Sequence, residues 1–292
     1  MLVAAALWGA VAMPASAFEL FGVRLWGDAA DADAAAVIAD PQPYHAVLTV
    51  NAEGSVDTNV RNASALLADQ DEPASGAAGL LAKARGDYRR IIAALYNEGY
   101  YGGSVSIRVG GVEATNLAPD VNLPDPVDVT ILVDPGPLFH FNSVNIANQA
   151  PPSADPGDRV DLPVTRGFAS GQVARSSVIL QAEQLALEAW RQQGHAKAAI
   201  AGRDVVADHA SRLVDVTISV DPGPRAAFGP VSVTGTERLD PDFLRRQTGL
   251  VEGAEYDPDD LALAQKRLDR LDVFRSARLE AAQALGAVGL QG

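Results

Sequence analysis

The chain has 292 residues, 48% hydrophobic and 21% charged, an ordinary globular composition that excludes a chain disordered throughout. Its 37 acidic residues outnumber 23 basic ones, and the formal net charge of −14 argues against a nucleic-acid partner, whose phosphates select basic surfaces. The sequence contains no cysteine, which excludes disulfides and thiolate chemistry and leaves packing to stabilise the fold.

The N-terminus has the pattern of a signal peptide. An apolar run, Leu2 to Met13, precedes the small residues Ala15-Ser16-Ala17, and it is shorter than the roughly 20 apolar residues that span a bilayer. We predict a signal peptide over residues 1–17 and an N-terminal segment over residues 18–43. No Lys or Arg precedes the apolar run, so the true start of the signal peptide stays open.

One phrase occurs twice, as VDVTILVDPGP from Val127 and as VDVTISVDPGP from Val214, with a single mismatch. The second copy lies 87 residues after the first. This offset also relates Phe141, Val144 and Ile146 to Phe228, Val231 and Val233. Usual solenoid repeats are roughly 20–50 residues long, whereas this period suits a small domain with its own core. The sequence therefore predicts tandem domains.

Each phrase predicts a strand and then a tight turn. Apolar residues alternate from Val127 to Val133, the pattern of a strand with one buried face. In Asp134-Pro135-Gly136-Pro137, proline fixes φ at the second turn position and glycine accepts the positive φ of the third. Asp221-Pro222-Gly223-Pro224 repeats this turn, and extended structure resumes at Phe139–Ile146. The phrase is thus predicted to end one domain and to start the next.

A helix and a return strand are predicted before each closing strand. The helix stripes end at Gly99 and Gly194, residues suited to the left-handed position after a helix. The return strands are expected at Ser104–Val109 and at about Ala196–Val206, and an earlier helix near Val56–Leu67. The stripes consist of Tyr88, Ile91, Ile92 and Leu95 in the first unit, and Val178, Ala182, Leu185, Ala189 and Trp190 in the second.

A third unit begins with a strand predicted at Phe228–Thr234. Two helices should follow, because Asp240-Pro241 and Asp257-Pro258 each place an N-cap aspartate before a proline at the first helical position. Leu261, Ala264, Leu268 and Leu271 form the stripe of the second helix, and Phe274–Leu279 is the expected return strand. No closing strand follows in this sequence, so we expect the third unit to be the least stable.

These residues resemble the POTRA domains of the BamA/TamA superfamily of outer-membrane assembly factors, and most closely its TamA branch of autotransporter assembly factors. The resemblance covers about Tyr44 to Leu279. Gly99-Tyr100 and Gly194-His195 match the family's Gly-Tyr stretch, whereas Asp272 departs from its usual glycine. The third unit matches best, at Gly235, Phe243, Leu244, Gly249, Leu250, Gly253, Tyr256, Leu261, Ala264, Leu268 and Phe274.

The resemblance implies an α+β fold of tandem POTRA-like β-α-α-β-β domains, each a three-stranded mixed sheet with two helices on one face. The domains would span residues 44–136, 137–223 and, incomplete at its C-terminus, 224–292. The sequence carries no membrane barrel that we detect, so membrane association is expected only if a C-terminal barrel follows. The chain is then an exported arm on the periplasmic side of the bacterial outer membrane.

The resemblance also implies partners. An unfolded outer-membrane or autotransporter client chain would add a strand to an open sheet edge, and an inner-membrane-anchored, TamB-like periplasmic subunit would dock on the arm. The opposite interpretation, that Arg108, Arg203 and nearby loops blunt these edges, is equally open for any one strand. The candidate edge residues are Ser104, Val105, Ser106, Ile107 and Arg108, together with Ala199, Ile200 and Ala201.

No enzyme is predicted. The sequence has no GxSxG, Walker A or HExxH motif, and neither a cofactor nor a metal is expected from the dispersed histidines His45, His140, His195 and His209. Trp190 is expected in the core. Two other functions stay open beside assembly of outer-membrane proteins, namely the arm of a two-partner secretion transporter and a soluble periplasmic adaptor.

Overall fold

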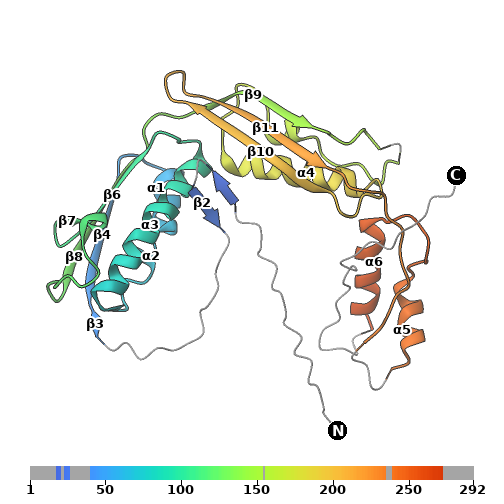
Figure 1. Cartoon of the computed structure of the whole chain (residues 1–292), viewed down its shortest axis with the longest axis horizontal. Helices are drawn as coiled ribbons and strands as arrows, with labels where there is room; N and C mark the ends of the chain where they lie inside the picture. Colours follow the sequence, from blue (N-terminus) through green and yellow to red (C-terminus); the bar gives the residue numbers. More distant parts are fainter. Residues whose placement is uncertain (1–17, 21–22, 27–39, 154, 235–238, 272–292) are drawn as a thin grey trace, which may run out of the picture. The chain divides into compact units, whose positions relative to one another are not determined.

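The computed structural model describes residues 18–20, 23–26, 40–153, 155–234 and 239–271 (Figure 1). Two compact units divide the chain, Met1–Phe139 and His140–Gly292. The predicted signal peptide and the return strand at Phe274–Leu279 lie outside the described residues. Within the described residues, no helix is both long and apolar enough to cross a membrane.

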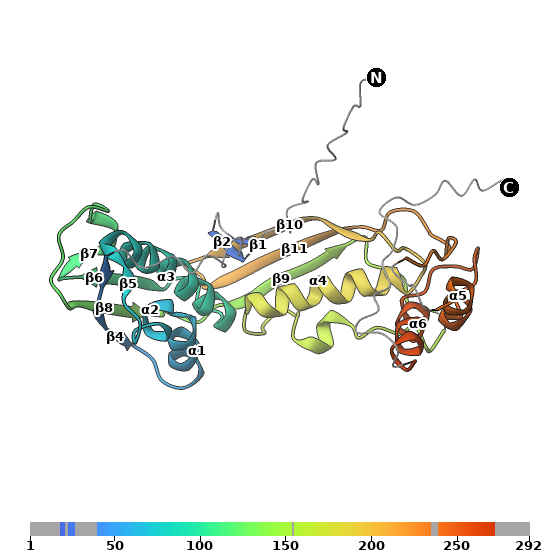
Figure 2. The same cartoon turned by 90° about the horizontal axis from the view of Figure 1, so that it is seen from below.

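The first unit is a mixed sheet with helices on one face (Figures 1 and 2). Its strand order is β4-β8-β6-β7, where β4 runs parallel to β8 and β6 antiparallel to it. The fourth strand, β7, adds to the three predicted. Bounds of the strands are β4 Tyr44–Val50, β6 Ser104–Val109, β7 Val112–Glu113 and β8 Val127–Asp134. The helices are α1 Ser55–Ala63, α2 Ala65–Ala68 and α3 Gly76–Glu98, with a 3-10 turn, η1, at Ala114–Asn116.

Two short strand pairs accompany this sheet. Strands β3 (Pro41–Gln42) and β5 (Ala74–Ser75) pair antiparallel. In the chain, β3 comes just before β4, and β5 comes just before α3. Near the N-terminus, β1 (Phe18–Leu20) and β2 (Val23–Trp26) form a hairpin. Neither pair was predicted.

The predicted periodicities of the first unit are confirmed. Every second residue of β8 from Val127 is buried, and Ile91 and Leu95 of α3 are fully buried against this face. Tyr88 and Ile92 pack at the margin of the same core. Helix α3 ends at Gly99 with φ of 92°, the left-handed conformation that only glycine adopts without strain.

A buried carboxylate joins the helices of this unit. Asp87 of α3 accepts hydrogen bonds from the backbone N–H groups of Ala65 (3.0 Å) and Leu66 (3.1 Å) and from the Ser64 hydroxyl (2.7 Å). These N–H groups begin α2, where a helix has no internal acceptors for them. Arg90 donates Nε and Nη2 to the same carboxylate, at 2.9 and 2.7 Å. The buried charge is thus paired as well as hydrogen-bonded.

The second unit contains a three-stranded sheet of order β10-β11-β9, and α4 covers one of its faces (Figures 1 and 2). β11 lies antiparallel to β10 and parallel to β9, as predicted for a mixed sheet. The first of the two predicted helices is only a 3-10 turn, η2, within a long loop, because the sequence there has several prolines and aspartates and no apolar period. The bounds are β9 His140–Ala147, η2 Pro163–Arg166, α4 Ser176–Arg191, β10 Ala199–Asp208 and β11 Leu213–Asp221.

Of the predicted stripe of α4 only Ala182 is fully buried, while Val178, Leu185, Ala189 and Trp190 are half-buried. The buried face consists of Ser176, Ile179, Ala182, Glu183, Ala186 and Leu187. Apolar residues fill such a wide arc of this helix that periodicity does not fix its rotation. A charged residue, Glu183, helps to set that rotation by pairing with Arg203 of β10 on the inner face of the sheet.

The rest of the second unit contains α5 (Pro241–Thr248) and α6 (Pro258–Asp269). Both predicted N-caps are confirmed, since Asp240 and Asp257 accept from the backbone N–H two residues on, at 2.9 and 2.7 Å. The strand predicted at Phe228–Thr234 is not formed, and only Ala227 makes an isolated bridge, to Glu255. A strand is defined by its ladder, and among the described residues this segment has no closing strand beside it.

We expect Asp87→Ala to destabilise the first unit by about 2–4 kcal/mol, because it removes the acceptor for three buried donors and leaves Arg90 unpaired. Hydrogen exchange of α2 and α3 in the full chain, measured at rising urea concentrations, gives this free energy. The matched control is Asp71→Ala, an exposed acid on the loop after α2, which should change stability by less than about 0.5 kcal/mol. Equal protection of α2 and α3 from exchange in both variants would contradict the role of Asp87 as the cap of α2.

Candidate functional site

The backbone of β6 offers an incoming chain much less than its length suggests. Ile107 donates its N–H to Glu113 Oε1 (3.1 Å), and its carbonyl accepts from the Tyr88 hydroxyl (3.2 Å), so both groups point away from β8. Backbone groups alternate in direction along a strand, and Val105 therefore also points outward. The backbone groups of Ser104, Ser106 and Arg108, which were predicted at this edge, are used by the ladder with β8.

A side-chain network covers the outward groups of Ile107. Besides Ile107, Glu113 accepts from the Ser106 hydroxyl at 2.8 Å and from the Tyr88 hydroxyl. Burial would raise the pKa of Glu113, but hydrogen bonds from Tyr88, Ser106 and Ile107 together hold this pKa below its usual value. Burial, and then the Glu113 carboxylate, raise the pKa of Tyr88 to about 12. The carboxylate is therefore charged and the phenol neutral at neutral pH, and the single phenol proton is shared between the Glu113 carboxylate and the Ile107 carbonyl.

The strand β7 closes the remaining end of the same edge. Its two residues pair with β6 as Arg108↔Glu113 and Val109↔Val112. Within the described residues, Val105 is consequently the one outward position of β6 that neither β7 nor the network covers. Sequence reasoning placed Tyr88 only on the buried stripe and missed its contact with Glu113, because nothing in their spacing shows that a residue of α3 and a residue of β7 meet at one strand.

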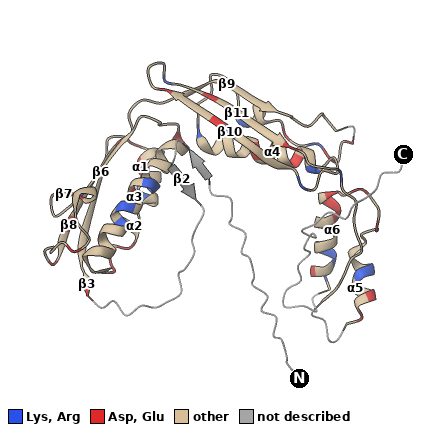
Figure 3. Cartoon of the chain, viewed as in Figure 1, with Lys and Arg blue, Asp and Glu red and all other residues tan. Residues whose placement is uncertain are grey.

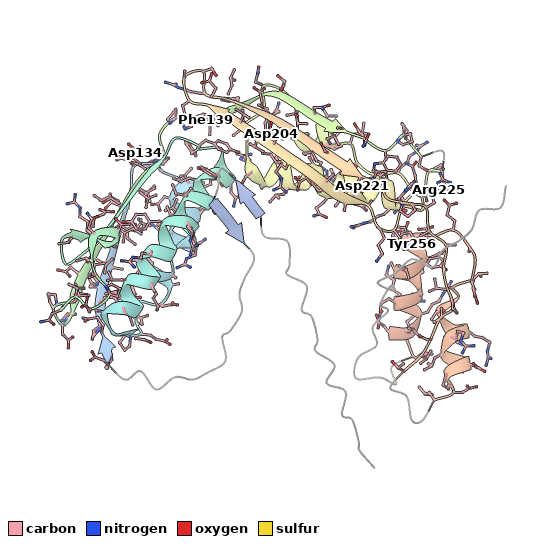
Figure 4. All side chains as sticks on the ribbon, viewed as in Figure 1. Asp134, Phe139, Asp204, Asp221, Arg225 and Tyr256 are labelled. Carbon is pink, nitrogen blue, oxygen red and sulfur yellow. The ribbon has the colours of Figure 1, made fainter. Side chains whose placement is uncertain are left out.

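The strand β10 is an edge of a different kind. Within the described part of the chain it pairs with β11 alone, along its whole length from Ala199 to Asp208. The predicted edge residues Ala199, Ile200 and Ala201 do lie on it, but Ala201 is the extra residue of a β-bulge between Ile200 and Gly202. The uninterrupted stretch follows the bulge, and Asp204, labelled in Figure 4, lies in it.

One charged side chain of β10 points inward. Arg203 forms a two-pronged ion pair with Glu183 of α4, whose carboxylate is almost fully buried. An inward-pointing charge is one of the devices by which proteins blunt an edge strand, because it opposes flat stacking against another sheet. Arg203 therefore supports the interpretation that this edge is blunted. The backbone from Asp204 to Ala207 nevertheless lies beside no described strand other than β11.

The opposite edge strand, β9, is partly covered. Phe141 donates its backbone N–H to Gln172 (2.9 Å) and accepts from Gly171 (2.8 Å), so the loop before α4 lies along its first residues. A bulge follows, where Asp215 of β11 accepts from the Ser143 hydroxyl (2.6 Å) and backbone (3.0 Å) and from the Asn142 side chain (2.9 Å). Hydrogen bonds from Ser143 and then Asn142 hold the pKa of Asp215 below its usual value.

Both predicted turns are formed, and in the same way. Gly136 and Gly223 have φ of 67° and 62°, the positive values that the sequence required of glycine. Each glycine donates its N–H to the aspartate two residues earlier, Asp134 at 3.1 Å and Asp221 at 3.0 Å (Figure 4). The prolines Pro135, Pro137, Pro222 and Pro224 complete these two turns.

After each turn the chain is tied to the end of the preceding helix. Phe139 donates its N–H to the Gly99 carbonyl, and Ala226 donates to the Gly194 carbonyl, both at 2.9 Å. Phe139 is fully buried and contacts the ring of Tyr101, whereas the second turn is held by polar contacts. Those contacts are His195 Nδ1 to the Gly223 carbonyl (2.8 Å) and the exposed ion pair of Arg225 with Glu255 (3.3 Å; Figure 4).

Trp190, predicted in the core, is half-buried instead. Its indole N–H donates to the Asn148 carbonyl at 2.7 Å, and its ring lies edge-on to His195. Across the residues that the structure describes, no three acidic or histidine side chains gather as a metal site.

Three of the four basic residues of α3, blue in Figure 3, are engaged within the first unit, and the fourth, Arg89, is exposed. Lys83 pairs with Asp69 (3.0 Å), and Arg85 donates to the Leu117 carbonyl (2.7 Å), while Arg90 binds Asp87 as described above. These contacts leave Arg89 as the basic residue of that helix that pairs with no other described residue.

No family model and no curated protein matches this chain. A solved structure of BamA POTRA3-5 from Haemophilus influenzae matches 81% of this chain and 87% of its own, with 19% identity and a TM-score of 0.52. The chain has a POTRA-like fold. Two further structures align at 13% identity: POTRA1-3 of the periplasmic domain of Omp85 from Anabaena, over 81% of this chain and 87% of its own with a TM-score of 0.33, and the N-terminal domain of Omp85 from Thermosynechococcus elongatus, over 79% and 86% with a TM-score of 0.32.

The POTRA-like order of elements is clearest in the first unit, where strand, helices, return strand and central closing strand follow each other completely. In the sheet of the second unit the closing strand β11 is again central, between β9 and β10. The repeated phrase thus forms the middle strand of each POTRA-like sheet.

Removal of the Asp215 carboxylate should have a pH-dependent effect. Because its folded pKa lies below the unfolded value of about 3.9, the charged group stabilises the fold above that value and loses this effect as pH falls through the folded pKa. We expect urea unfolding to show Asp215→Ala less stable than the parent at pH 7, with the difference shrinking below about pH 4.

The control for this titration is Asp204→Ala, an exposed acid on the neighbouring strand. Its difference from the parent protein should stay small at every pH. A difference for Asp215→Ala that is the same at pH 7 and at pH 3 would show that the carboxylate does not clamp the bulge.

Proposed function

We propose that this chain is the POTRA region of an outer-membrane protein assembly factor, acting on the periplasmic side as a scaffold rather than an enzyme. Its clients are unfolded outer-membrane chains, autotransporters among them, which it holds in extended form by strand addition. The observation that carries the proposal is the edge of β10, which pairs with β11 alone among the described residues of a POTRA-like unit. The solved neighbour in Haemophilus influenzae is described as part of BamA, which supports this assignment by fold.

Strand addition suits a client of variable sequence. Affinity comes from main-chain hydrogen bonds, which every residue except proline offers, and side chains contribute only secondary preferences. The stretch Asp204–Ala207 after the bulge presents its backbone in regular register, and Val206 on the outer face is 52% exposed. An extended chain laid along β10 therefore meets backbone first, with one apolar side chain beside it.

The three-domain division, the signal peptide and the docking of a TamB-like partner belong to the same proposal. The client and the TamB-like subunit would need different surfaces, because a client binds a strand edge for a short time whereas a subunit docks stably. In this division the turn residues Asp134–Pro137 and Asp221–Pro224 lie where one proposed domain ends and the next begins.

A photo-crosslinking residue at Val206 should capture nascent outer-membrane proteins in cells. The matched control is Val251, also a valine and somewhat more exposed, at 66%, on the loop between α5 and α6. Capture at Val206 at least about fivefold above Val251 is expected if a client strand lies on β10, given roughly 1 kcal/mol for each backbone hydrogen bond. Equal capture at both positions would contradict binding at this edge.

Deletion of the gene separates this proposal from the two alternatives. Assembly of outer-membrane proteins predicts that several barrel proteins decline together in the outer-membrane fraction, as quantitative proteomics would show. Loss of one secreted protein alone would favour a two-partner secretion transporter. No change in either class would favour a soluble periplasmic adaptor.

A further inference from the structure

The two POTRA-like units treat their return strands differently, although the repeated phrase makes their central strands nearly identical. Between β6 and β8 the chain inserts residues 110–126, whereas β10 and β11 are joined by residues 209–212 alone. The longer connection makes the Gly110-Gly111 turn, at φ of 58° and 82°, and returns as β7 along β6. Glu113 is thereby placed beside Ile107.

A strand added to β6 would need the outward backbone groups of this strand. In an antiparallel or parallel ladder, one side of a strand uses alternate residues, which for β6 are Val105, Ile107 and Val109. Val109 lies in the pair with Val112, and both groups of Ile107 are taken, the N–H by Glu113 and the carbonyl by Tyr88. Only Val105 is left, and one residue does not make a ladder.

Several contacts hold the side chains of Glu113 and Tyr88 in place. Glu113 accepts from three donors at once, on Ile107, Ser106 and Tyr88, and Arg108 lies 3.9 Å away as a further positive charge. Tyr88 is fixed by its position on α3, whose neighbouring residues Ile91 and Ala84 are buried in the core. Displacing the carboxylate would leave the Ser106 hydroxyl without this acceptor and the Tyr88 phenol with the Ile107 carbonyl alone, a free-energy cost that opposes an added strand.

We propose that Glu113 and Tyr88 form a built-in plug that closes the β6 edge to strand addition, so that an extended client is admitted at β10 and not at β6. This inference rests on the proposed function and names which edge performs it. An uncovered strand edge can also pair with the wrong chains, and the plug prevents such pairing at β6.

The first test compares strand capture at the two edges of the full chain. The probe is a peptide of alternating threonine and valine, about ten residues long with terminal lysines. Photo-crosslinkers at Ser104 on β6 and at Val206 on β10 report where it binds; Ser104 is exposed and lies outside the plug. The parent protein should capture the peptide at Val206 and not at Ser104.

Opening the plug should add a second binding edge. In the double variant Tyr88→Phe and Glu113→Ala, capture at Ser104 should rise at least about fivefold, because both groups of Ile107 become available, each hydrogen bond being worth roughly 1 kcal/mol. Capture at Val206 should not change, which also shows that the variant keeps its second unit intact. The control is Glu72→Ala, an exposed acid of the first unit, which should leave Ser104 silent.

A second measurement tests the plug without any peptide. Amide exchange by NMR should show the Ile107 N–H protected in the parent and at least about fivefold faster in Glu113→Ala, while Val105 exchanges fast in both. Fast exchange of Ile107 in the parent, or equal capture at Ser104 and Val206, would overturn the plug. Absence of peptide capture at both edges in every variant would overturn the proposed function instead, and Ile107 exchange would still decide the plug.

Discussion

Unpaired backbone groups at the edges of small sheets are the constraint on which this molecule depends. A sheet of three or four strands has two edges, and each N–H or C=O there must meet water, a side chain or another chain. The chain satisfies its edges by three means: the β7 hairpin with its carboxylate on β6, the loop at Gly171-Gln172 on β9, and an inward Arg203 on β10. Of these three, only Arg203 leaves the backbone of its strand uncovered; among the described strands β4, the other edge of the first sheet, also pairs with a single neighbour, β8.

The same constraint gives two hydrogen-bonded carboxylates their places, the buried Asp87 and the more exposed Asp215. Asp87 takes the first N–H groups of α2, and Asp215 takes the N–H that the β9 bulge removes from the ladder. In both cases a carboxylate replaces the backbone carbonyl that regular structure would have supplied. The acidic composition of the chain is therefore partly structural, and it cannot be assigned wholly to a solvated surface.

Much of the fold follows from local rules in the sequence. Alternation located β8 and β11, glycines located the ends of helices at Gly99 and the turns at Gly136 and Gly223, and aspartate-proline pairs located α5 and α6. Such signals involve only neighbouring residues, so they can be recognised in the sequence. The rotation of α4 and the cover on β6 were missed because they depend on Glu183 meeting Arg203 and on Tyr88 meeting Glu113, contacts between residues 20 and 25 positions apart.

The repeated phrase shows why the candidate site was only partly predictable. Repetition identifies what two units share, and here it marks the central strands and the turns, which provide the frame of each sheet. Edges differ because the connections around them differ: residues 110–126 fold back on β6, whereas residues 209–212 only join β10 to β11, and β10 pairs with no other described strand. If client binding is confined to β10, function in this chain lies in the part of the duplicated unit that was not kept the same.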